Sequence, residues 1–594
     1  MRSRVIQSNL TKGAISPTLH GRIDTETYTQ GLKTAENVVI MPHGGVRRRG
    51  GMQKITDNYV SASSGRIEPF VFSRTESYLM LFTNNQIEIF FGGVSQATVV
   101  STYTTAELYD LDIIQSADTV IITHEDHAPA KLVRGATHAN WTLSDITIVG
   151  MPQYVYDTVA EDVWSVTRGW PRTCTFHIGR LWFGGSKSKV NSVWGSVAGD
   201  IFNFAIGSGA DDDAIFDTID TDTFNEINGI VSAGSLQVFT RSQEFYNTGG
   251  VITPSSSGWV SFSSNGAKRI RPLFLNGATL FVDSTARTLR QAVFNDTEQS
   301  FNPINISMLS DHLLNDVVSL EAIKGTTADF SDLVFLVNGD GTVAVLNTLR
   351  NEGIQGWTQW TTDGLFKDVA VVDKSVYFLI ERGGNLFIEV LQEGTYSDHN
   401  TKVEGTPPTV DNVVFGLDNV TLGGDNVVFQ DPTTGVTITS VTTDINDLLA
   451  YSQYWRVVAD GSVMASALPT NDGVDLNHFD IGRNAYTAEV GLDYPVTIET
   501  LPLNIATKSE GYMINLEKRV NRVILRLYES LGVKVQDTIM NDRRFIVTLD
   551  KAPVPFTGIK EVRLLGYGRL VEVTISQDDP LPLTLLSIDT EVEV

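Results

Sequence analysis

The chain has 594 residues, 42% of them hydrophobic and 19% charged, which excludes a disordered protein and favours two to four globular domains. Its single cysteine, Cys174, excludes an internal disulfide and fits assembly in a cytosol. The formal net charge of −26 argues against a protein that grips DNA through an overall basic surface. The acidity favours either solubility or a channel wall that a polyanion passes without sticking.

The first segment, residues 1–60, is rich in turns, and we expect it to form an N-terminal docking segment. A short strand is predicted over Val38–Met41, before Pro42 and a glycine turn. A basic cluster follows at Arg47, Arg48 and Arg49, whose side chains are either solvated or in contact with an acidic neighbour or DNA phosphate. We expect no signal peptide, because the N-terminus has no apolar h-region. We expect no direct membrane insertion, because no apolar run approaches ~18 residues.

Residues 61–398 carry a loose repeat in which an apolar strand, a turn and a second apolar strand recur, with a spacing of roughly 45–60 residues. Strands such as Leu79–Phe82 and Leu333–Val337 are apolar on both faces, which is typical of propeller blades packed between neighbours. Six or seven such units predict a β-propeller, whereas a pair of β-sandwiches would show cleaner alternation. Examples of the units begin at Ile67, Leu111, Ile227, Ile270, Ser331 and Val369.

The most distinctive stretch of this repeat is residues 169–214. Apolar runs at Cys174–Ile178 and Arg180–Phe183 flank Gly179, which predicts two strands joined by a tight turn. A third strand is expected near Val193–Ser196, and the consecutive aspartates Asp211–Asp213 end the stretch. It contains no arrangement of nucleophile and base and no metal-ligand spacing, so it does not indicate catalysis.

The composition changes after the repeat. Residues 399–450 are rich in Thr, Asp, Gly and Val, and we expect a small β insertion there that forms a protruding tip. The motif DNVVF occurs twice in it, at Asp411–Phe415 and Asp425–Phe429, and predicts short strands. One or two helical turns are expected at Ile445–Tyr451.

The last segment, residues 451–594, is again rich in strands. Val523, Leu525 and Leu527 share one strand face, and the same alternation recurs over Phe545–Leu549 and Val571–Ile575. Such strands have one buried and one wet face, so we expect a sandwich-like C-terminal β platform domain.

A search for catalytic motifs predicts no enzyme. The sequence contains no Walker loop, no H-E-x-x-H motif and no G-x-S-x-G elbow, and we expect no cofactor and no metal. His124 and His127 lie three residues apart on a loop before Pro129. Because no third ligand is evident, loop packing is favoured over a metal site.

Two further groups of side chains can be interpreted in more than one way. Asp211, Asp212 and Asp213 favour a solvated or channel-facing acidic patch over calcium, because their spacing does not match an EF-hand. The same carboxylates would also suit ion pairs with neighbouring subunits or an acid/base pair. Trp357 and Trp360 are expected in the core of a blade rather than as a platform that stacks on sugars.

The sequence resembles the tail nozzle proteins of short-tailed bacteriophages, which are also called tail tubular protein B or stabilisation proteins. The residues that carry this likeness in the middle of the chain are Gly169, Pro171, Arg172, Arg180–Phe183, Trp194, Gly195, Ser196, Gly199, Asp200, Phe202–Phe204 and Asp211–Asp213. Gly13–Asp24, Leu492–Asn504 and the C-terminal stretch from Gln577 extend the likeness to both ends.

This resemblance implies a structural protein of the virion tail, assembled in the cytoplasm of the bacterial host. It implies a homohexameric ring below the portal and adaptor that retains packaged DNA and forms the channel for its ejection. The implied partners are the tail adaptor protein, tail fibre or tip proteins, and double-stranded DNA that passes through the lumen without sequence-specific binding. In such a ring Asp211, Asp212 and Asp213 would line an acidic channel. Two rival hypotheses are a carbohydrate-binding or polysaccharide-degrading β-propeller of the tail, and a secreted adhesin.

Overall fold

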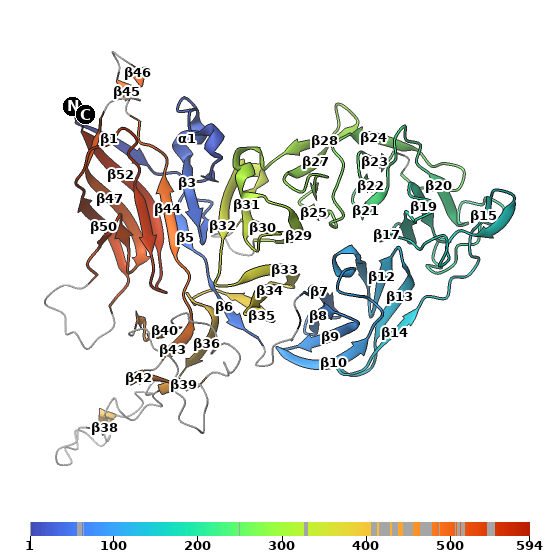
Figure 1. The fold of residues 1–594 in the computed structure, drawn as a ribbon, viewed down its shortest axis with the longest axis horizontal. Coiled ribbons are helices and arrows are strands. Elements are labelled where there is room, and N and C mark those ends of the chain that lie inside the picture. Colours follow the sequence, from blue (N-terminus) through green and yellow to red (C-terminus); the bar gives the residue numbers. More distant parts are fainter. Residues whose placement is uncertain are drawn as a thin grey trace, which may run out of the picture.

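The structure is a computed structural model, and the part of the chain that it describes consists almost entirely of strands (Figure 1). The described strands form a propeller of seven blades and a platform of two facing sheets, which confirms the mainly β fold class. The description covers residues 2–593 except 56–61, 63, 249, 326–330, 405–412, 415–427, 430–437, 443–454, 464–477, 486, 505, 508–510, 513–516 and 543–552.

The first five blades are consecutive four-stranded antiparallel meanders, each starting with its inner strand. Blade one contains β7 (Arg66–Val71), β8 (Ser77–Thr83), β9 (Gln86–Phe91) and β10 (Val94–Val100); blade two contains β11 (Asp112–Ser116), β12 (Thr119–His124), β13 (His127–Arg134) and β14 (Trp141–Asp145). Blade three contains β17 (Thr173–His177), β18 (Arg180–Gly184), β19 (Ser192–Gly195) and β20 (Ile215–Thr218); blade four contains β21 (Ile227–Ser232), β22 (Leu236–Thr240), β23 (Glu244–Asn247) and β24 (Trp259–Ser263). Blade five contains β25 (Leu273–Leu275), β26 (Ala278–Val282), β27 (Leu289–Asn295) and β28 (Ser300–Asn305).

The last two blades connect the propeller to the rest of the molecule. Blade six contains β29 (Val317–Ile323), β30 (Asp332–Asn338), β31 (Val343–Leu349) and β32 (Ile354–Trp360). Blade seven contains β33 (Leu365–Val372), β34 (Ser375–Arg382) and β35 (Asn385–Gln392), and its outer strand is β6 (Gly51–Lys54). β6 pairs antiparallel with β35, from Glu389 opposite Lys54 to Gln392 opposite Gly51. A strand from the N-terminal segment therefore completes the last blade.

Apolar side chains fill the interfaces between neighbouring blades. For example, Trp182 and Val238 lie in one buried cluster between blades three and four, and Leu81 and Leu379 lie in another between blades one and seven. Trp357 and Trp360 are fully buried in blade six, as predicted, and each indole donates a hydrogen bond to a backbone carbonyl. Neither tryptophan can stack on a sugar.

The platform is built from both ends of the chain. One sheet contains β1 (Arg2–Gln7), β4 (Val38–Ile40), β5 (Val46–Arg48), β52 (Thr584–Glu593), β47 (Arg519–Ser530) and the edge strand β50 (Phe556–Arg563). The facing strands are β2 (Gly13–Ala14), β3 (Gly31–Glu36), β44 (Val496–Thr500), β51 (Thr574–Gln577), β48 (Lys534–Val535) and β49 (Thr538–Ile539). Val523 and Leu525 of the first sheet share one core with Ile498 and Ile575 of the second, which is the sandwich-like packing predicted.

Two continuous sheets join the propeller to the platform. Blade six continues through β2 and β3 into β44 and β51, giving ten hydrogen-bonded strands. Blade seven continues from β6 into β36 (Asp398–Glu404), β43 (Thr487–Leu492), β40 (Trp455–Ala459) and β41 (Ser462–Val463). The described strands of residues 1–60 thus belong to the platform and to blade seven, and they do not form a segment of their own.

The remaining described elements are small. A hairpin, β15 (Gln153–Tyr156) and β16 (Val159–Asp162), projects between blades two and three, and β37 (Val413–Val414) pairs with β38 (Val428–Phe429). The other elements are β39 (Ile438–Thr442), β42 (His478–Ala485), β45 (Ala506–Thr507), β46 (Gly511–Tyr512), α1 (Glu26–Gln30), and the short η1 (Pro17–Leu19), η2 (Leu108–Asp110), η3 (Met308–Leu313) and η4 (Arg350–Glu352). Among the described residues, no helix is long and apolar enough to cross a membrane.

Three predictions concern residues outside the described part of the chain. The strand at Phe545–Leu549 and the helical turns at Ile445–Tyr451 lie there entirely, and the insertion at residues 399–450 lies there in part. Of the insertion, the described residues show that each DNVVF motif contributes one short strand to the β37–β38 pair.

Gly13 tests the connection between blade six and the platform. Its φ is +63°, and an added Cβ would overlap the backbone of Trp357 in β32. We expect Gly13→Ala to lower the free energy of unfolding by at least ~2 kcal/mol, measured by denaturant titration. Gly21→Ala is the matched control, because its Cβ would meet no atom within 4 Å. Equal effects of the two substitutions would contradict this expectation.

Candidate functional site

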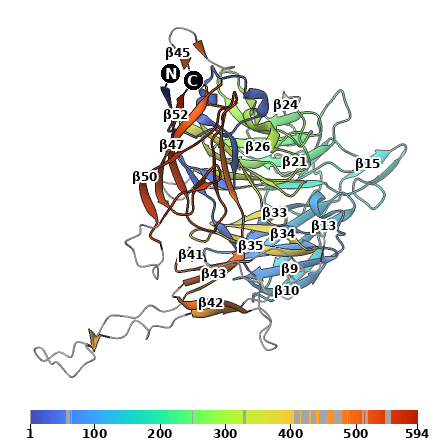
Figure 2. The same ribbon diagram turned by 60° about the vertical axis from the view of Figure 1, so that its left-hand side comes forward.

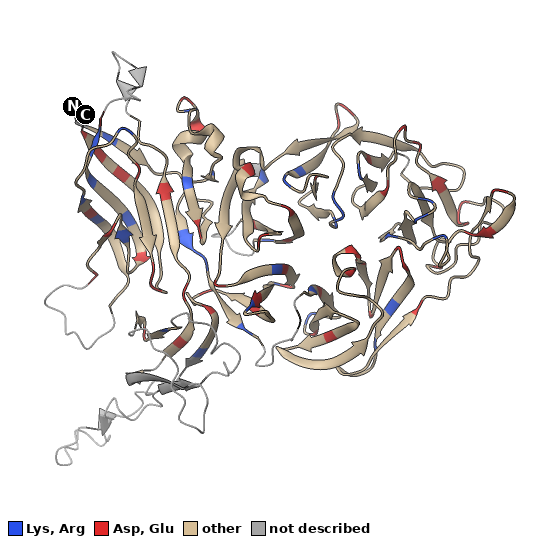
Figure 3. Ribbon diagram, viewed as in Figure 1, with Lys and Arg blue, Asp and Glu red and all other residues tan. Residues whose placement is uncertain are grey.

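A small charged cavity lies on the propeller axis, between the inner strands of the blades. Its volume is about 70 Å³, enough for a few water molecules. Figure 3 shows basic and acidic segments at the inner ends of the blades. The charged residues that line the cavity are Arg66, Glu68, Asp110, Asp112, Arg269, Arg271, Glu321 and Asp368.

Ion pairs between different blades close this axis. Arg271, just before β25 of blade five, donates to Asp112 of blade two, with 2.7 Å between Nη1 and Oδ1. Arg269 lies 3.6 Å from Asp110 on the connection that leads into blade two. Among the described residues, the propeller therefore has no open bore through which a DNA duplex could pass.

Two carboxyl groups of the cavity bind protons more tightly than usual. Burial raises the pKa of Asp368 to about 6, although nearby Arg66 opposes this shift. Burial also raises the pKa of Glu321 to about 8, and the nearby Glu68 carboxylate adds to that shift. The cavity thus contains groups that titrate near neutral pH, unlike ordinary surface carboxylates.

Glu321→Gln should change how stability depends on pH. Because the folded state raises the pKa of Glu321, the unfolded state loses this proton first, and the stability contribution falls as pH rises from about 4.5 to about 8. We expect the variant to match the wild type near pH 5 and to have the higher Tm at pH 8. Glu352→Gln, at an exposed position, is the control. Parallel Tm curves for wild type and Glu321→Gln would contradict the assignment.

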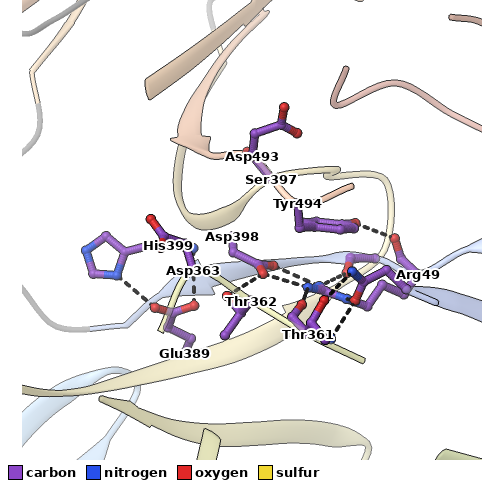
Figure 4. A network of polar contacts seen from close by, with 12 residues as sticks. Arg49, Thr361, Thr362, Asp363, Glu389, Ser397, Asp398, His399, Asp493 and Tyr494 are labelled. Carbon is purple, nitrogen blue, oxygen red and sulfur yellow. Dashed lines mark hydrogen bonds and ion pairs between the residues drawn. The ribbon is translucent and has the colours of Figure 1, made fainter. Parts of the chain in front are cut away.

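A second polar site lies where blade seven meets the platform, and Figure 4 shows it from close by. Arg49 is fully buried and donates two hydrogen bonds to Asp398, at 2.8 and 2.6 Å. Its guanidinium also lies 3.6 Å from the centre of the Tyr494 ring. Further donations reach the side chain of Asn37 and the carbonyl of Thr361. One side chain thus connects the N-terminal segment, blade six, β36 and the platform.

The neighbouring part of this site contains a second buried pair. Arg382 donates two hydrogen bonds to Glu389, at 2.9 and 3.1 Å, and His399 Nδ1 lies 2.8 Å from the same carboxylate. Burial alone would raise the pKa of Glu389, but Arg382 and the hydrogen bond from His399 outweigh it and lower the pKa to about 2. The Glu389 carboxylate is therefore ionised at every pH at which the protein is expected to work.

The basic cluster predicted to dock against partners is mostly internal. Arg48 is buried and donates to the Gln577 side chain and to the carbonyl of Tyr494. Arg48 and Arg49 therefore cannot act as docking contacts, because both charges are already satisfied inside the fold. Arg47 is the exposed member of the cluster, and it lies 3.1 Å from Glu393.

The acidic cluster lies on the loop that leads into β20, the last strand of blade three. Asp211 and Asp212 are exposed and form no ion pair with any described residue. The Asp213 carboxylate instead accepts the backbone N–H groups of Gly209 and Ala210, which fixes the loop. Whether the exposed pair lines a channel between subunits stays a prediction.

A third residue joins the two histidines that the sequence singled out. Glu107, His124 and His127 place their ligating atoms within 4.8 Å of one another. However, the backbone N–H of Asp126 donates to His124 Nδ1 at 3.1 Å, so the neutral ring carries its proton on Nε2. Burial and nearby Arg269 lower the pKa of His124. The arrangement favours a hydrogen-bonded cluster over a metal site.

No family model and no curated protein matches this chain. Among solved structures, the WD40 domain of Pan2 from Neurospora crassa is similar at 9% identity and a TM-score of 0.35, over 58% of this chain and 96% of that one. A chain in the structure of the mitotic checkpoint complex is similar at 9% identity and a TM-score of 0.34, over 61% and 92%. These scores are too low to carry an argument, and the strand order itself defines the propeller.

Arg49→Met tests the junction between propeller and platform. Removing one partner of a buried ion pair leaves the other charge unpaired, so we expect the free energy of unfolding to fall by about 3–5 kcal/mol. Arg47→Met should change it by less than about 0.5 kcal/mol, because the Arg47–Glu393 pair is solvent-exposed. Both values come from denaturant titration. A loss for Arg49→Met no larger than that for Arg47→Met would contradict the role assigned to this junction.

Proposed function

We propose that this protein is a structural component of the tail of a short-tailed bacteriophage, forming the nozzle ring below the portal and adaptor. The observation that supports this best is the pair of continuous sheets that run from blades six and seven into the platform. Hydrogen-bonded sheets, together with the buried Arg49–Asp398 pair, make the propeller and platform one stiff body. Stiffness is what a ring that holds back pressurised DNA requires.

The closed propeller axis indicates where DNA would pass. In this proposal DNA passes between subunits of the ring and not through one propeller, because ion pairs such as Arg271–Asp112 cross the propeller axis. The net charge of −26 per chain then favours the passage of DNA, because an acidic channel wall offers no sites that bind and hold a polyanion. In this proposal the ring is a homohexamer, its neighbours are the adaptor and the fibre or tip proteins, and it reaches the virion after assembly in the bacterial cytoplasm.

Virions that carry Asp211→Lys and Asp212→Lys test the proposal. If these exposed side chains line the channel, the new cations attract phosphate, and we expect slower DNA ejection with unchanged DNA retention. Asp211→Asn with Asp212→Asn is the control that removes charge without reversing it. Asp213 stays unchanged because it fixes the loop. Normal ejection by the lysine variant would remove these residues from the channel. Absence of the protein from purified virions would contradict the proposed function itself.

A further inference from the structure

The hairpin β15–β16 projects from the propeller at the end opposite the platform (Figures 1 and 2). Its sheet contains only these two strands, and such a ribbon is marginally stable by itself in water. One face is covered by cations: Lys189 lies 3.2 Å from the centre of the Tyr154 ring, and Arg168 lies 3.8 Å from that of Tyr156. The hairpin is thus held to blade three and its flanking loop through one face.

The other face of the hairpin is exposed to solvent. The register places Gln153 opposite Asp162 and Val155 opposite Ala160, and all four residues are exposed. Asp157 at the turn is also exposed, and neither it nor Asp162 forms an ion pair with a described residue. The hairpin therefore presents a small apolar face beside two exposed carboxylates. Asp162 accepts a hydrogen bond from Gln153 within the hairpin, and Asp157 contributes to the raised pKa of Arg168.

The open edge of the platform has the complementary chemistry. β50 pairs with β47 on one side, and its other side has no strand partner among the described residues. Ile559 on this strand is exposed, and Leu565 just beyond it is 90% exposed. Arg563 and Arg569 are exposed as well and form no ion pair with the rest of the described chain. An unprotected edge with apolar side chains is a template for pairing with another strand.

A hollow of about 550 Å³ opens beside this edge. Arg519, Arg522 and Arg563 line it together with Asn521, Leu564, Leu565 and one carboxylate, Glu591. Arg522 is held by Glu591 at 2.7 Å, whereas the buried Nε of Arg519 has no hydrogen-bond partner in the described structure. The hollow can accept a carboxylate at Arg563, which is exposed and forms no ion pair with a described residue, because guanidinium groups bind carboxylates with charge-assisted hydrogen bonds.

We propose that the β15–β16 hairpin of one copy docks on the β50 edge and the arginine-lined hollow of a second copy of this chain. Val155 and Ala160 cover the apolar side chains around Leu565, and the carboxylates of Asp157 and Asp162 meet the guanidinium groups of the hollow. The hairpin would then gain the third strand that it lacks. This inference deepens the proposed function, because it names the contact by which the ring forms.

The positions of the two surfaces indicate a second copy as the occupant. They lie at opposite ends of the same molecule, so one chain cannot bring them together (Figure 1). They carry opposite charge, which steers a head-to-tail encounter and makes it weaken with salt. A head-to-tail contact is heterologous, and repeating it gives a closed ring when the rotation between copies closes.

Charge reversal on each surface tests the contact in the purified full-length protein. We expect wild type to assemble beyond the monomer in mass photometry at low salt. Asp157→Arg with Asp162→Arg, and separately Arg563→Asp with Arg569→Asp, should each raise the concentration needed for assembly at least tenfold. All four substitutions in one chain should restore assembly, because the charges are again complementary. Asp296→Arg with Glu298→Arg, at two exposed positions on the turn between β27 and β28, is the matched control, with the same change of charge and no expected loss of assembly.

A cross-link provides a second measurement that does not depend on charge. The one native cysteine, Cys174, is buried. Val155→Cys with Leu565→Cys in one chain should give disulfide-linked oligomers on oxidation, and neither single substitution should do so. Circular dichroism of each variant checks that it is folded.

The outcomes separate this contact from the proposed function. If both charge-reversed variants assemble as well as wild type and no cross-link forms, the proposed contact is wrong. That outcome does not contradict the proposed ring. Wild type that stays monomeric at all concentrations would also overturn the contact. Capture of DNA or of another protein by the β50 edge, with no self-association, would assign that surface to a different occupant.

Discussion

The whole arrangement depends on burying arginine charge at one junction. Arg49 is removed from water together with Asp398, and Arg382 together with Glu389, all four without exposed side-chain surface. Such burial is costly unless each charge finds a partner and each remaining N–H finds an acceptor. The partners of Arg49 come from β36, the end of blade six and the N-terminal segment, so its charge is satisfied only when all of these are in place. Arg382 and Glu389 both belong to blade seven, and His399 of β36 contacts the same carboxylate. The junction therefore specifies one relative position of propeller and platform.

The same principle operates on the propeller axis with a different result. There, Arg271 and Asp112 belong to different blades, and their ion pair ties those blades together across the cavity. Fewer guanidinium than carboxyl groups line this cavity, so the partly buried Glu321 carboxyl group has a raised pKa instead of pairing fully with an arginine. A propeller with ion pairs across its axis is unsuited to conduct DNA through that axis, but it suits a rigid subunit of a larger assembly. The surfaces left for contact with other molecules are then the blade edges, the hairpin and the platform.

The blades could be predicted from sequence because their signal is local. The runs around Gly179 predicted β17 and β18 within one residue, since a two-residue turn with positive φ at Ile178 and Gly179 joins them. Two-sided apolar strands such as β30 indicated burial between neighbours. By contrast, the sequence predicted that Arg48 and Arg49 are either solvated or dock against an acidic neighbour or DNA phosphate. Their partners, Gln577 and Asp398, lie hundreds of residues away, and no local pattern indicates such a pairing. The role of β6 in blade seven and the third member of the His124 cluster, Glu107, were missed for the same reason.

The pairing of β6 with β35 and of β1 with β52 also constrains the order of events during synthesis. β6 can pair with β35 only after the preceding blades have been made, and β1 can pair with β52 only after the other platform strands, so the last blade closes before the platform. A chain cut short would lack β52 and would leave β1 and β47 without a strand that both require. Only a chain that extends through β52 can thus form the platform sheet that carries the β50 edge.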